Sequence, residues 1–455
     1  MFAVALVATA VRLPGVYTQA FWQDEVASAR IIDEPTFRRV LAHVARTEST
    51  PPLWYVLGWL LRQAGTPLQD IRLLSVASGA LLVALVVDVG RRVVPLPLAS
   101  LAGLVVALGG QLVGHGQELR SYELLALLSI VFARCLLAVL DEPSKRREVA
   151  LGATVAAGGL THYFFAFSVL AVLVWLWLDR GVRPARRQAT TAILAGGLVA
   201  AMWSPVMLRQ LHQGRFWWIG SFQLRTVIAV PARLFTSAYA NTTAGIALSV
   251  AALLLVVVGA ARLGRASATG RLVVVLAFGP LAEAAVVWAA GVRIFALRNL
   301  IEIAPFVAVA VVAGLEVVPR RAAVSLGAAT ALLLLLPFTP LSTDPVTPPF
   351  DAMARELVAE GWTPSEPVAV FGNFFSYRAP LEWYLPHQPM LEASRPLHAV
   401  CRTVFVIRGD EVSRLRLRRP LEDDRQLRGA TFLASPADRS PCVRPITTGR
   451  LAALA

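Results

Sequence analysis

The stretch that decides the fold begins with Phe21-Trp-Gln-Asp-Glu-Val-Ala-Ser-Ala-Arg30 and continues to Thr47-Glu-Ser-Thr-Pro-Pro-Leu-Trp-Tyr55. It follows the first apolar segment directly and carries two adjacent acids, Asp24 and Glu25. Charged side chains are costly inside a bilayer, so a long polar interruption in an apolar chain indicates a site at the membrane surface. The other segments are interpreted from this loop outward.

Composition indicates a polytopic membrane protein. The 455 residues are 56% hydrophobic and 16% charged, and the mean hydropathy is +0.62. These values are too apolar for a soluble enzyme of this length. The net charge of +14 does not indicate a nucleic-acid partner, because the only lysine is Lys145 and the arginine bias is typical of GC-rich coding.

Hydropathy predicts about twelve apolar segments, from residues 1–16 to residues 322–337. The run at residues 1–10 has no cleavage site and is expected to be a retained first span. Segment 51–64 is shorter than the roughly 20 residues that a spanning helix needs. It contains Arg62, and its aromatic residues, including Trp54 and Trp59, are typical of the membrane interface. We therefore expect a surface-lying or re-entrant helix there, which leaves about eleven transmembrane helices.

Basic residues then assign the two sides of the membrane. With eleven spans, every short basic cluster falls on one side, which the positive-inside rule identifies as the cytoplasm. The opposite side receives loop 18–70, residues 114–122, residues 161–163, the loop with Trp217 and Trp218, and the C-terminal residues. Histidine, glutamate, tyrosine and tryptophan concentrate there. This predicts an extracytoplasmic site at the membrane surface.

The composition changes after the last span. Residues 337–349 are rich in proline and threonine, as in a linker. Residues 351–360 have helical spacing, and residues 368–371, 403–407 and 431–433 are typical of short strands. The sequence thus predicts a transmembrane domain over 1–338 and a small extracytoplasmic α/β domain over 339–455. Cys401 and Cys442 in that domain form either a disulfide or two free thiols.

Four motifs carry a resemblance to a known family. They are Trp22-Gln-Asp-Glu25 after the first span, Thr50-Pro-Pro-Leu-Trp-Tyr55, Gln117-Glu-Leu-Arg-Ser-Tyr122 and Thr161-His-Tyr-Phe164. In this order, over about residues 10–320, the chain resembles glycosyltransferase family 39 and its bacterial relatives. That group belongs to the GT-C superfamily and includes protein O-mannosyltransferases and the aminoarabinose transferases of lipid A.

The resemblance implies an inverting glycosyltransferase of the bacterial inner membrane. Such an enzyme transfers a hexosyl or pentosyl group from a polyprenyl-phosphate donor to a hydroxyl of a lipid, glycan or protein, at the extracytoplasmic face. The resemblance implies that Asp24 is the catalytic base, with Glu25 and Glu48 as supporting acids. A carboxylate can take the acceptor's proton and stabilise an oxocarbenium-like transition state. A transporter or flippase, or a polymerase, of lipid-linked glycans remains an alternative.

The leaving lipid phosphate requires positive charge. Arg120, Arg293 and Arg298 are predicted to bind it, since each follows or precedes a span on the external side and guanidinium matches phosphate. Some relatives have lysine before the Pro-Pro step where this chain has Thr50. The predicted substrate-binding residues are Tyr55, Glu118, Tyr122, His162 and Tyr163.

Several pairings are expected around this site. Glu118 and Tyr122 flank Arg120 at helical spacing and are expected to orient it. Arg298 and Glu302 are one helical turn apart and could pair, and Glu283, inside a span, could pair with an external arginine. No cofactor is required, although a divalent metal on Asp24, Glu48 and His43 is possible. No His-x-x-x-His or Cys-x-x-Cys spacing supports it.

Overall fold

The computed structural model describes residues 1–214, 216, 218–236, 243–317, 350–359, 368–370, 374–385, 390–392, 402–408, 424–427 and 430–434. Two expectations fall outside these residues. They are the last apolar segment, 322–337, and the pairing of Cys401 with Cys442.

The chain divides into two compact units, which we describe separately. The first contains residues 1–16 and 31–339, and the second contains residues 17–30 and 340–455. The second unit therefore combines the start of the first polar loop, with Asp24 and Glu25, and the C-terminal residues. The sequence does not indicate this grouping, because hydropathy and spacing connect only neighbouring segments.

Within the described residues of the first unit, all secondary-structure elements are helices. Its elements are α1 (Phe2–Thr18), α3 (Phe37–Thr47), α4 (Leu53–Gln63), η1 (Asp70–Arg72), α5 (Leu73–Gly90), α6 (Leu96–Leu108), α7 (Gly110–His115), α8 (Tyr122–Asp141), α9 (Lys145–Thr161), α10 (Phe165–Leu178), η2 (Arg180–Val182), α11 (Arg186–Ala201), α12 (Ser204–Leu211), α13 (Leu224–Thr236), α14 (Thr243–Ala266), α15 (Ala268–Ala289), η4 (Leu297–Ile303) and α16 (Ala304–Leu315).

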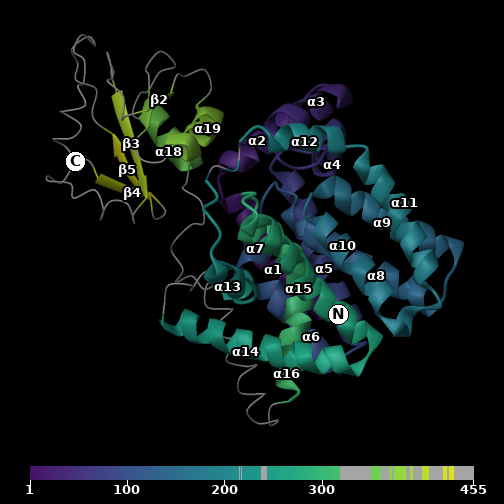
Figure 1. Cartoon of the computed structure of the whole chain (residues 1–455). Coiled ribbons are helices and arrows are strands. Elements are labelled where there is room, and N and C mark those ends of the chain that lie inside the picture. Colours follow the sequence, from purple (N-terminus) through teal and green to yellow (C-terminus); the bar gives the residue numbers. More distant parts are fainter. Residues whose placement is uncertain are drawn as a thin grey trace. The chain divides into compact units, whose positions relative to one another are not determined.

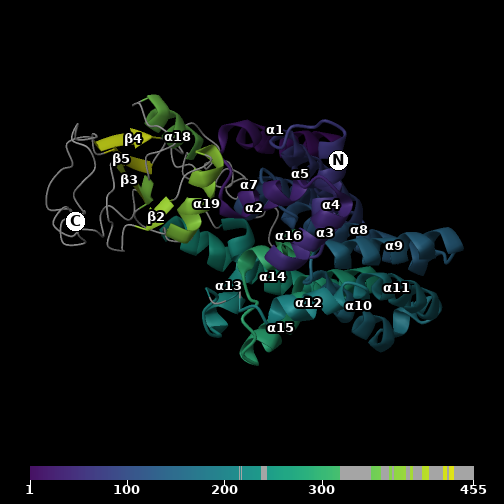
Figure 2. The same ribbon diagram turned by 90° about the horizontal axis from the view of Figure 1, so that it is seen from above.

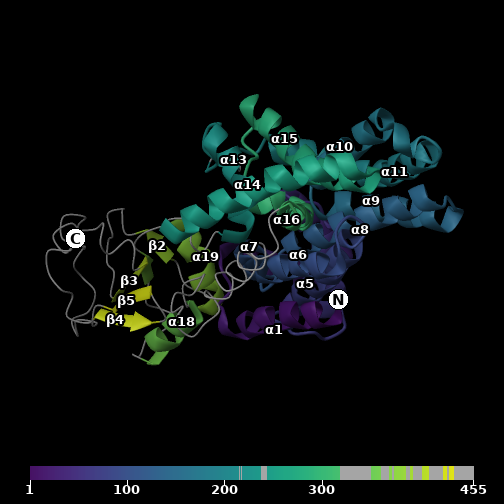
Figure 3. The ribbon, with the colours of Figure 1, turned by 90° about the horizontal axis from the view of Figure 1, so that it is seen from below.

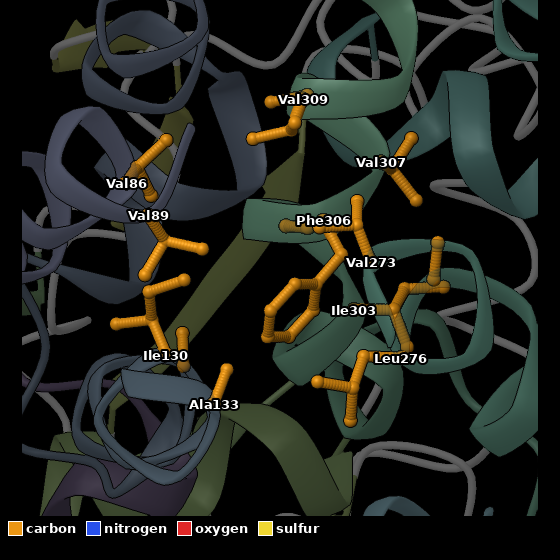
Figure 4. Close-up of a cluster of buried hydrophobic side chains, with 14 of the residues drawn as sticks. Val86, Val89, Ile130, Ala133, Val273, Leu276, Ile303, Phe306, Val307 and Val309 are labelled. Atoms are coloured by element: carbon orange, nitrogen blue, oxygen red, sulfur yellow. The ribbon is translucent and has the colours of Figure 1, made fainter. Parts of the chain in front are cut away.

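The core of this unit surrounds α16. Every residue of α16 is buried, as expected for a helix that is apolar on all sides. Figure 4 shows Phe306 of α16 facing Ile130 and Ala133 of α8 on one side and Val273 and Leu276 of α15 on the other. This packing holds the helices that carry the polar loops in fixed register.

Small residues allow two helix pairs to approach closely. Gly259 of α14 lies against the backbone of α16, where a Cβ atom would meet the carbonyl of Ala310. Gly196 of α11 meets the carbonyl of Gly152 on α9 in the same way. Both pairs lie side by side in Figures 1 and 2. Close backbone approach through small residues is typical of helix pairs in membranes.

The helix lengths indicate a multi-pass membrane protein. Among the described residues, 5 helices are long and apolar enough to cross a bilayer, or up to 7 if each of two bent pairs is one span. One bent pair is α11 with α12, at 60°. Two shorter apolar helices are α6 and α10. The sequence-based number of about eleven spans remains a prediction.

Helix α4 is short, as the sequence predicted for segment 51–64. It has 11 residues, which correspond to about 16 Å, roughly half of the hydrocarbon thickness. Trp54 and Tyr55 are buried, whereas Leu60 is exposed. Trp59 donates a hydrogen bond from Nε1 to the carbonyl of Glu34 at 2.9 Å. The helix is thus fixed to the chain segment before α3 along one face.

The apolar segment over residues 95–114 is divided into two helices. Helix α6 ends at Leu108, Gly109 has an extended backbone with φ of −60° and ψ of 125°, and α7 begins at Gly110. A Cβ atom at Gly109 would lie 2.9 Å from Cδ1 of Phe235. The helix breaks here because glycine is a weak helix former and because α13 packs closely against this point.

Arginine–carboxylate pairs gather where α5 and α8 end. Asp88 accepts from Arg91 at 2.7 Å and from Arg134 at 2.8 Å, and Arg92 pairs with Asp141 at 2.8 Å. The chain segment before Tyr122, at the other end of the 20-residue helix α8, is about 30 Å away along the helix.

The second unit contains strands and helices in its described residues. These are α2 (Gln23–Ile32, of which residues 23–30 belong to this unit), α18 (Phe350–Ala359), β1 (Val368–Val370), α19 (Phe374–Tyr384), β2 (Met390–Glu392), β3 (Arg402–Arg408), β4 (Asp424–Leu427) and β5 (Ala430–Ala434).

One sheet holds all five strands in the order β2-β1-β3-β5-β4. Strand β1 pairs in parallel with β2 and β3, whereas β5 pairs antiparallel with β3 and β4. Helices α18 and α19 lie beside the sheet (Figure 3). Helix α18 and strands β1, β3 and β5 coincide with the elements expected from the sequence, whereas α19, β2 and β4 were not predicted.

The start of the polar loop packs against α19 within this unit. The amide of Phe21 donates to the hydroxyl of Tyr384 at 2.9 Å, and the rings of Phe21 and Trp383 lie edge to face at 6.1 Å. Arg30 lies 3.9 Å from Glu382. These three contacts attach both ends of segment 17–30 to one helix.

Candidate functional site

The residues before α8 form the centre of the candidate site, and they are not helical. Helix α7 ends at His115, and Gly116 to Ser121 form turns and bends before α8 starts at Tyr122. Ser75 of α5 holds this segment by donating to the carbonyl of Glu118 at 2.8 Å. The expectation that Glu118 and Tyr122 flank Arg120 at helical spacing is therefore wrong, because glycines at 114 and 116 weaken the helix.

Arg120 belongs to a buried network with Glu48, Thr50 and Tyr55. The Tyr55 hydroxyl donates to Oε2 of Glu48 at 2.7 Å and lies 3.0 Å from the Thr50 hydroxyl. Nη1 of Arg120 donates to Glu48 at 3.4 Å and to the Tyr55 hydroxyl at 3.3 Å. Loop 18–70 and the segment before α8 thus meet through three of the residues predicted from sequence.

Burial keeps Tyr55 protonated. Desolvation, together with the charge of Glu48, raises the pKa of the Tyr55 phenol well above its usual value, although Arg120 lowers it. The phenol therefore remains a donor to the carboxylate at physiological pH. Glu48 is in this way held as an acceptor beside Arg120.

A second group of side chains surrounds Tyr122, and we call it the Tyr122 cluster. The guanidinium carbons of Arg120 and Arg298 lie 5.8 and 5.9 Å from the centre of the Tyr122 ring. The rings of His115 and His162 lie 4.6 and 5.9 Å from the same ring. The Tyr122 cluster thus consists of Tyr122, Arg120, Arg298, His115 and His162.

The two arginines create a positive field in this cluster. His162 is buried, and its pKa is lowered to about 3 by desolvation and by the charges of Arg120 and Arg298. Its Nδ1 accepts from the amide of Phe164 at 3.3 Å, which places the proton on Nε2. His162 is therefore neutral at physiological pH. An anion between the two guanidinium groups would be stabilised by this field.

The other predicted binding residues lie in different surroundings. Tyr163 donates to Gln210 of α12 at 2.6 Å, and burial raises its pKa. Glu118 pairs with Nδ1 of His115 at 2.8 Å. Arg293 is exposed in the loop after α15. Trp218, from the loop after α12, lies 5.0 Å from the guanidinium carbon of Arg298.

Asp24 and Glu25 lie in the first turn of α2, within the second unit. Oε2 of Glu25 accepts a weak hydrogen bond from the amide of Trp22 at 3.4 Å, and Ser28 donates to the Asp24 carbonyl at 3.1 Å. Glu25 is buried and Asp24 is half-buried. Through this contact with the start of its own helix, Glu25 lies at the α2 N-terminus, where negative charge is favourable.

The possible metal ligands are engaged elsewhere. Nδ1 of His43 lies 2.9 Å from Oε1 of Glu34, while Glu48 belongs to the Arg120 network. Within the part of the chain that the structure describes, no three His, Cys, Asp or Glu side chains converge as a metal site.

Two expected ion pairs are absent from the described residues. Glu302 accepts from Ser168 at 2.9 Å, and its second oxygen has no hydrogen-bond partner among the described residues. Oε2 of Glu283 is also buried and has no hydrogen-bond partner among the described residues. Within the described residues, the contacts of Glu302 and Glu283 thus do not include the ion pairs with Arg298 or Arg293 that the sequence allowed.

Sequence reasoning missed a buried ion pair behind the cluster. Arg12 of α1 donates to Glu123 at 3.0 Å and to the carbonyl of Ala107 at 2.8 Å, and both side chains of the pair are fully buried. Glycines at 79 and 116 leave room for the Arg12 side chain. An arginine within the first apolar segment was the available signal. This pair joins α1, the end of α6 and the start of α8 beside Tyr122.

Comparison with known proteins identifies the fold. No family model and no curated protein sequence matches the chain. Among solved structures, ArnT from Cupriavidus metallidurans bound to undecaprenyl phosphate aligns over 95% of this chain and 97% of its own, with a TM-score of 0.56 and 12% identity. Its apo structure aligns equally widely, with a TM-score of 0.55.

A second neighbour comes from an archaeon. The oligosaccharyltransferase AglB of Archaeoglobus fulgidus, in complex with an inhibitory peptide and a dolichol-phosphate, covers 98% of this chain and 74% of its own, with a TM-score of 0.54 and 12% identity. ArnT and AglB are members of the GT-C superfamily. The resemblance expected from the motifs is thus confirmed at the level of structure: the chain shares the fold of these two proteins.

Proposed function

We propose that this protein transfers a sugar from a polyprenyl-phosphate donor to an acceptor hydroxyl, with inversion at the anomeric carbon. The observation that carries the proposal is the convergence of Arg120 and Arg298 on Tyr122, next to His162, which burial and the charges of these two arginines keep neutral. Two guanidinium groups in a largely buried position are suited to hold a phosphate.

The aromatic surroundings of Arg298 support a ligand role. In the Tyr122 cluster, Arg298 lies over the rings of Tyr122 and Trp218. Aromatic faces attract a guanidinium group and hold it in place. This places the positive charge of Arg298 beside Arg120 on the same tyrosine ring.

Asp24 is the proposed base. Adjacent residues of a helix point about 100° apart, so Asp24 and Glu25 cannot serve the same face. The contact of Glu25 with the start of its own helix favours Asp24 for the chemistry. The acceptor oxygen attacks the anomeric carbon while its proton passes to Asp24. The bond from that carbon to the phosphate oxygen breaks, and the phosphate leaves with the electron pair, stabilised by the arginines.

The neighbours support the class of donor. One ArnT structure contains undecaprenyl phosphate and one AglB structure contains a dolichol-phosphate. We extend this lipid-phosphate class to the present chain. The proposed setting is the extracytoplasmic face of a bacterial inner membrane, with residues 339–455 on that side. A lipid, glycan or protein hydroxyl is the proposed acceptor.

The test uses purified full-length protein in detergent with a radiolabelled polyprenyl-phosphate sugar and no membrane gradient. We expect Asp24→Asn to abolish transfer while the melting temperature and lipid-phosphate binding persist. Arg298→Ala should weaken binding of the lipid phosphate roughly 10- to 100-fold, the value of a charge-assisted hydrogen bond. Arg91→Ala is the matched control, because it removes an arginine at the end of α5, away from the Tyr122 cluster.

Three results would contradict the proposal. Normal transfer by Asp24→Asn would remove the base. Movement of the intact lipid-linked sugar across vesicles, without consumption in detergent, would indicate a flippase. Processive growth of a lipid-linked chain would indicate a polymerase.

A further inference from the structure

His115 and Glu118 form a buried pair that the proposed reaction does not yet use. Nδ1 of His115 lies 2.8 Å from Oε2 of Glu118, and the two side chains are 11% and 10% exposed. The carboxylate oxygen accepts a hydrogen bond from Nδ1–H. The other ring nitrogen, Nε2, is buried and has no hydrogen-bond partner among the described residues.

If His115 served only to pair with Glu118, its Nε2 would not be expected to lie buried without a hydrogen-bond partner. A buried polar atom without a partner costs about 1–3 kcal/mol, so proteins rarely retain one without a use. The His115 ring lies 4.6 Å from Tyr122, the same ring that Arg120 and Arg298 face. His115, with its unpartnered Nε2, is therefore part of the Tyr122 cluster, which is proposed to bind phosphate.

The charges around His115 come from three directions. Glu118 lies on the segment that follows α7, and Glu123 of α8 interacts electrostatically with the imidazole. Glu123 is itself paired with Arg12 of α1. The His115 ring packs against Tyr122, and Arg120 and Arg298 face the same tyrosine ring. Glu118 is thus the carboxylate in direct contact with Nδ1. When the imidazole carries both protons, Nδ1–H donates to Glu118 and Nε2–H can donate to a ligand.

We propose that His115, held by Glu118, binds the donor phosphate through Nε2–H, as a third donor beside Arg120 and Arg298. This inference rests on the proposed function. Nδ1–H donates to Glu118 and Nε2–H donates to a phosphate oxygen. When the bond from the anomeric carbon to phosphate breaks, the electron pair stays on the phosphate, and the hydrogen bond from His115 strengthens with the added charge. No proton needs to leave the imidazole.

The test compares binding of undecaprenyl phosphate with binding of undecaprenol, which lacks the phosphate, to full-length protein in detergent. His115→Phe keeps an aromatic ring against Tyr122 and removes both nitrogens. His115→Gln keeps one amide donor. His212→Gln is the control, because His212 is exposed at the end of α12 and its Nδ1 lies 2.6 Å from the Leu208 carbonyl.

We expect His115→Phe to weaken undecaprenyl phosphate binding roughly 10- to 100-fold and to leave undecaprenol binding within twofold of wild type. His115→Gln should lose less, roughly 3- to 10-fold, because a neutral donor makes a weaker hydrogen bond to phosphate. If His115→Phe does not fold, the Gln variant alone decides. Glu118→Gln should lie between the two, since it retains an acceptor for Nδ1 and removes the charge.

The outcomes separate this inference from the proposed function. Unchanged phosphate binding in both His115 variants, with weakened binding in Arg298→Ala, overturns the role of His115 and leaves the transferase proposal standing. Equal loss of undecaprenol and undecaprenyl phosphate binding shows a packing role and also overturns it. A wild-type protein that does not prefer the phosphate over the alcohol contradicts the proposed function itself.

Discussion

His162 predicts an acid sensitivity whose size follows from its surroundings. Desolvation and the charges of Arg120 and Arg298 lower its pKa from 6.5 to about 3. Between these values the unfolded chain binds a proton that the folded protein does not bind. Stability therefore falls as the pH drops below about 6.5, by about 1.4 kcal/mol for each pH unit. At pH 5 the loss from this residue is about 2 kcal/mol.

His162→Gln isolates this contribution. Glutamine is neutral throughout, and its amide oxygen can accept the Phe164 amide that His162 Nδ1 accepts. We expect the difference in unfolding free energy between wild type and variant to be constant above pH 7. It should shift in favour of the variant by about 2 kcal/mol at pH 5. Thermal unfolding in detergent between pH 5 and 8 measures it.

A bound lipid phosphate should reduce the effect. Its negative charge would offset Arg120 and Arg298, which are two of the three causes of the lowered pKa. With saturating undecaprenyl phosphate, the wild type should therefore lose less stability at pH 5 than without it. Parallel curves for wild type and His162→Gln over the whole range would refute the electrostatic description of the cluster.

Three further outcomes are expected from other parts of the chain. Tyr55→Phe should cost about 1–3 kcal/mol of stability because Glu48 loses a buried donor, and thermal unfolding measures it at neutral pH. Arg12→Met should cost about 3–5 kcal/mol by leaving a buried carboxylate without its partner, whereas the double variant with Glu123→Leu should recover most of the loss; a double variant as unstable as the single one would contradict this. A reporter enzyme fused after residue 338 should be active only outside the cytoplasm, and cytoplasmic activity would refute the eleven-span topology.

The sequence predicted features that depend on composition and local pattern. The short helix α4 followed from the length of its apolar segment. Helix α18 and strands β1, β3 and β5 followed from alternation and helical periodicity. In each case the residues that determine the element are neighbours in the chain.

Features that depend on distant residues were not predicted. The non-helical segment before Tyr122 is fixed by Ser75 of another helix, and the end of α6 at Gly109 depends on Phe235. The pairing of Glu118 with His115, in place of Arg120, results from this segment. Hydropathy measures the apolar character of a segment, but it contains no information on where the backbone turns.

Among the predicted site residues of the first unit, the structure brings Glu48 and Tyr55 together with Arg120 before α8. Glu48 and Tyr55 meet Arg120, while Arg298 and His162 reach the same tyrosine ring. The motifs suggested which residue types matter, because resemblance carries chemical roles. They did not identify His115, since its role depends on a nitrogen whose surroundings only the fold determines.

The most direct test of the central claim is a cryo-electron microscopy structure of the full-length protein with undecaprenyl phosphate. We predict density for the phosphate within hydrogen-bond distance of the guanidinium groups of Arg120 and Arg298, beside the Tyr122 ring. Phosphate density at the opposite end of the helices, beside Arg91 and Arg134, or density for the lipid without any contact to the Tyr122 cluster, would contradict the account.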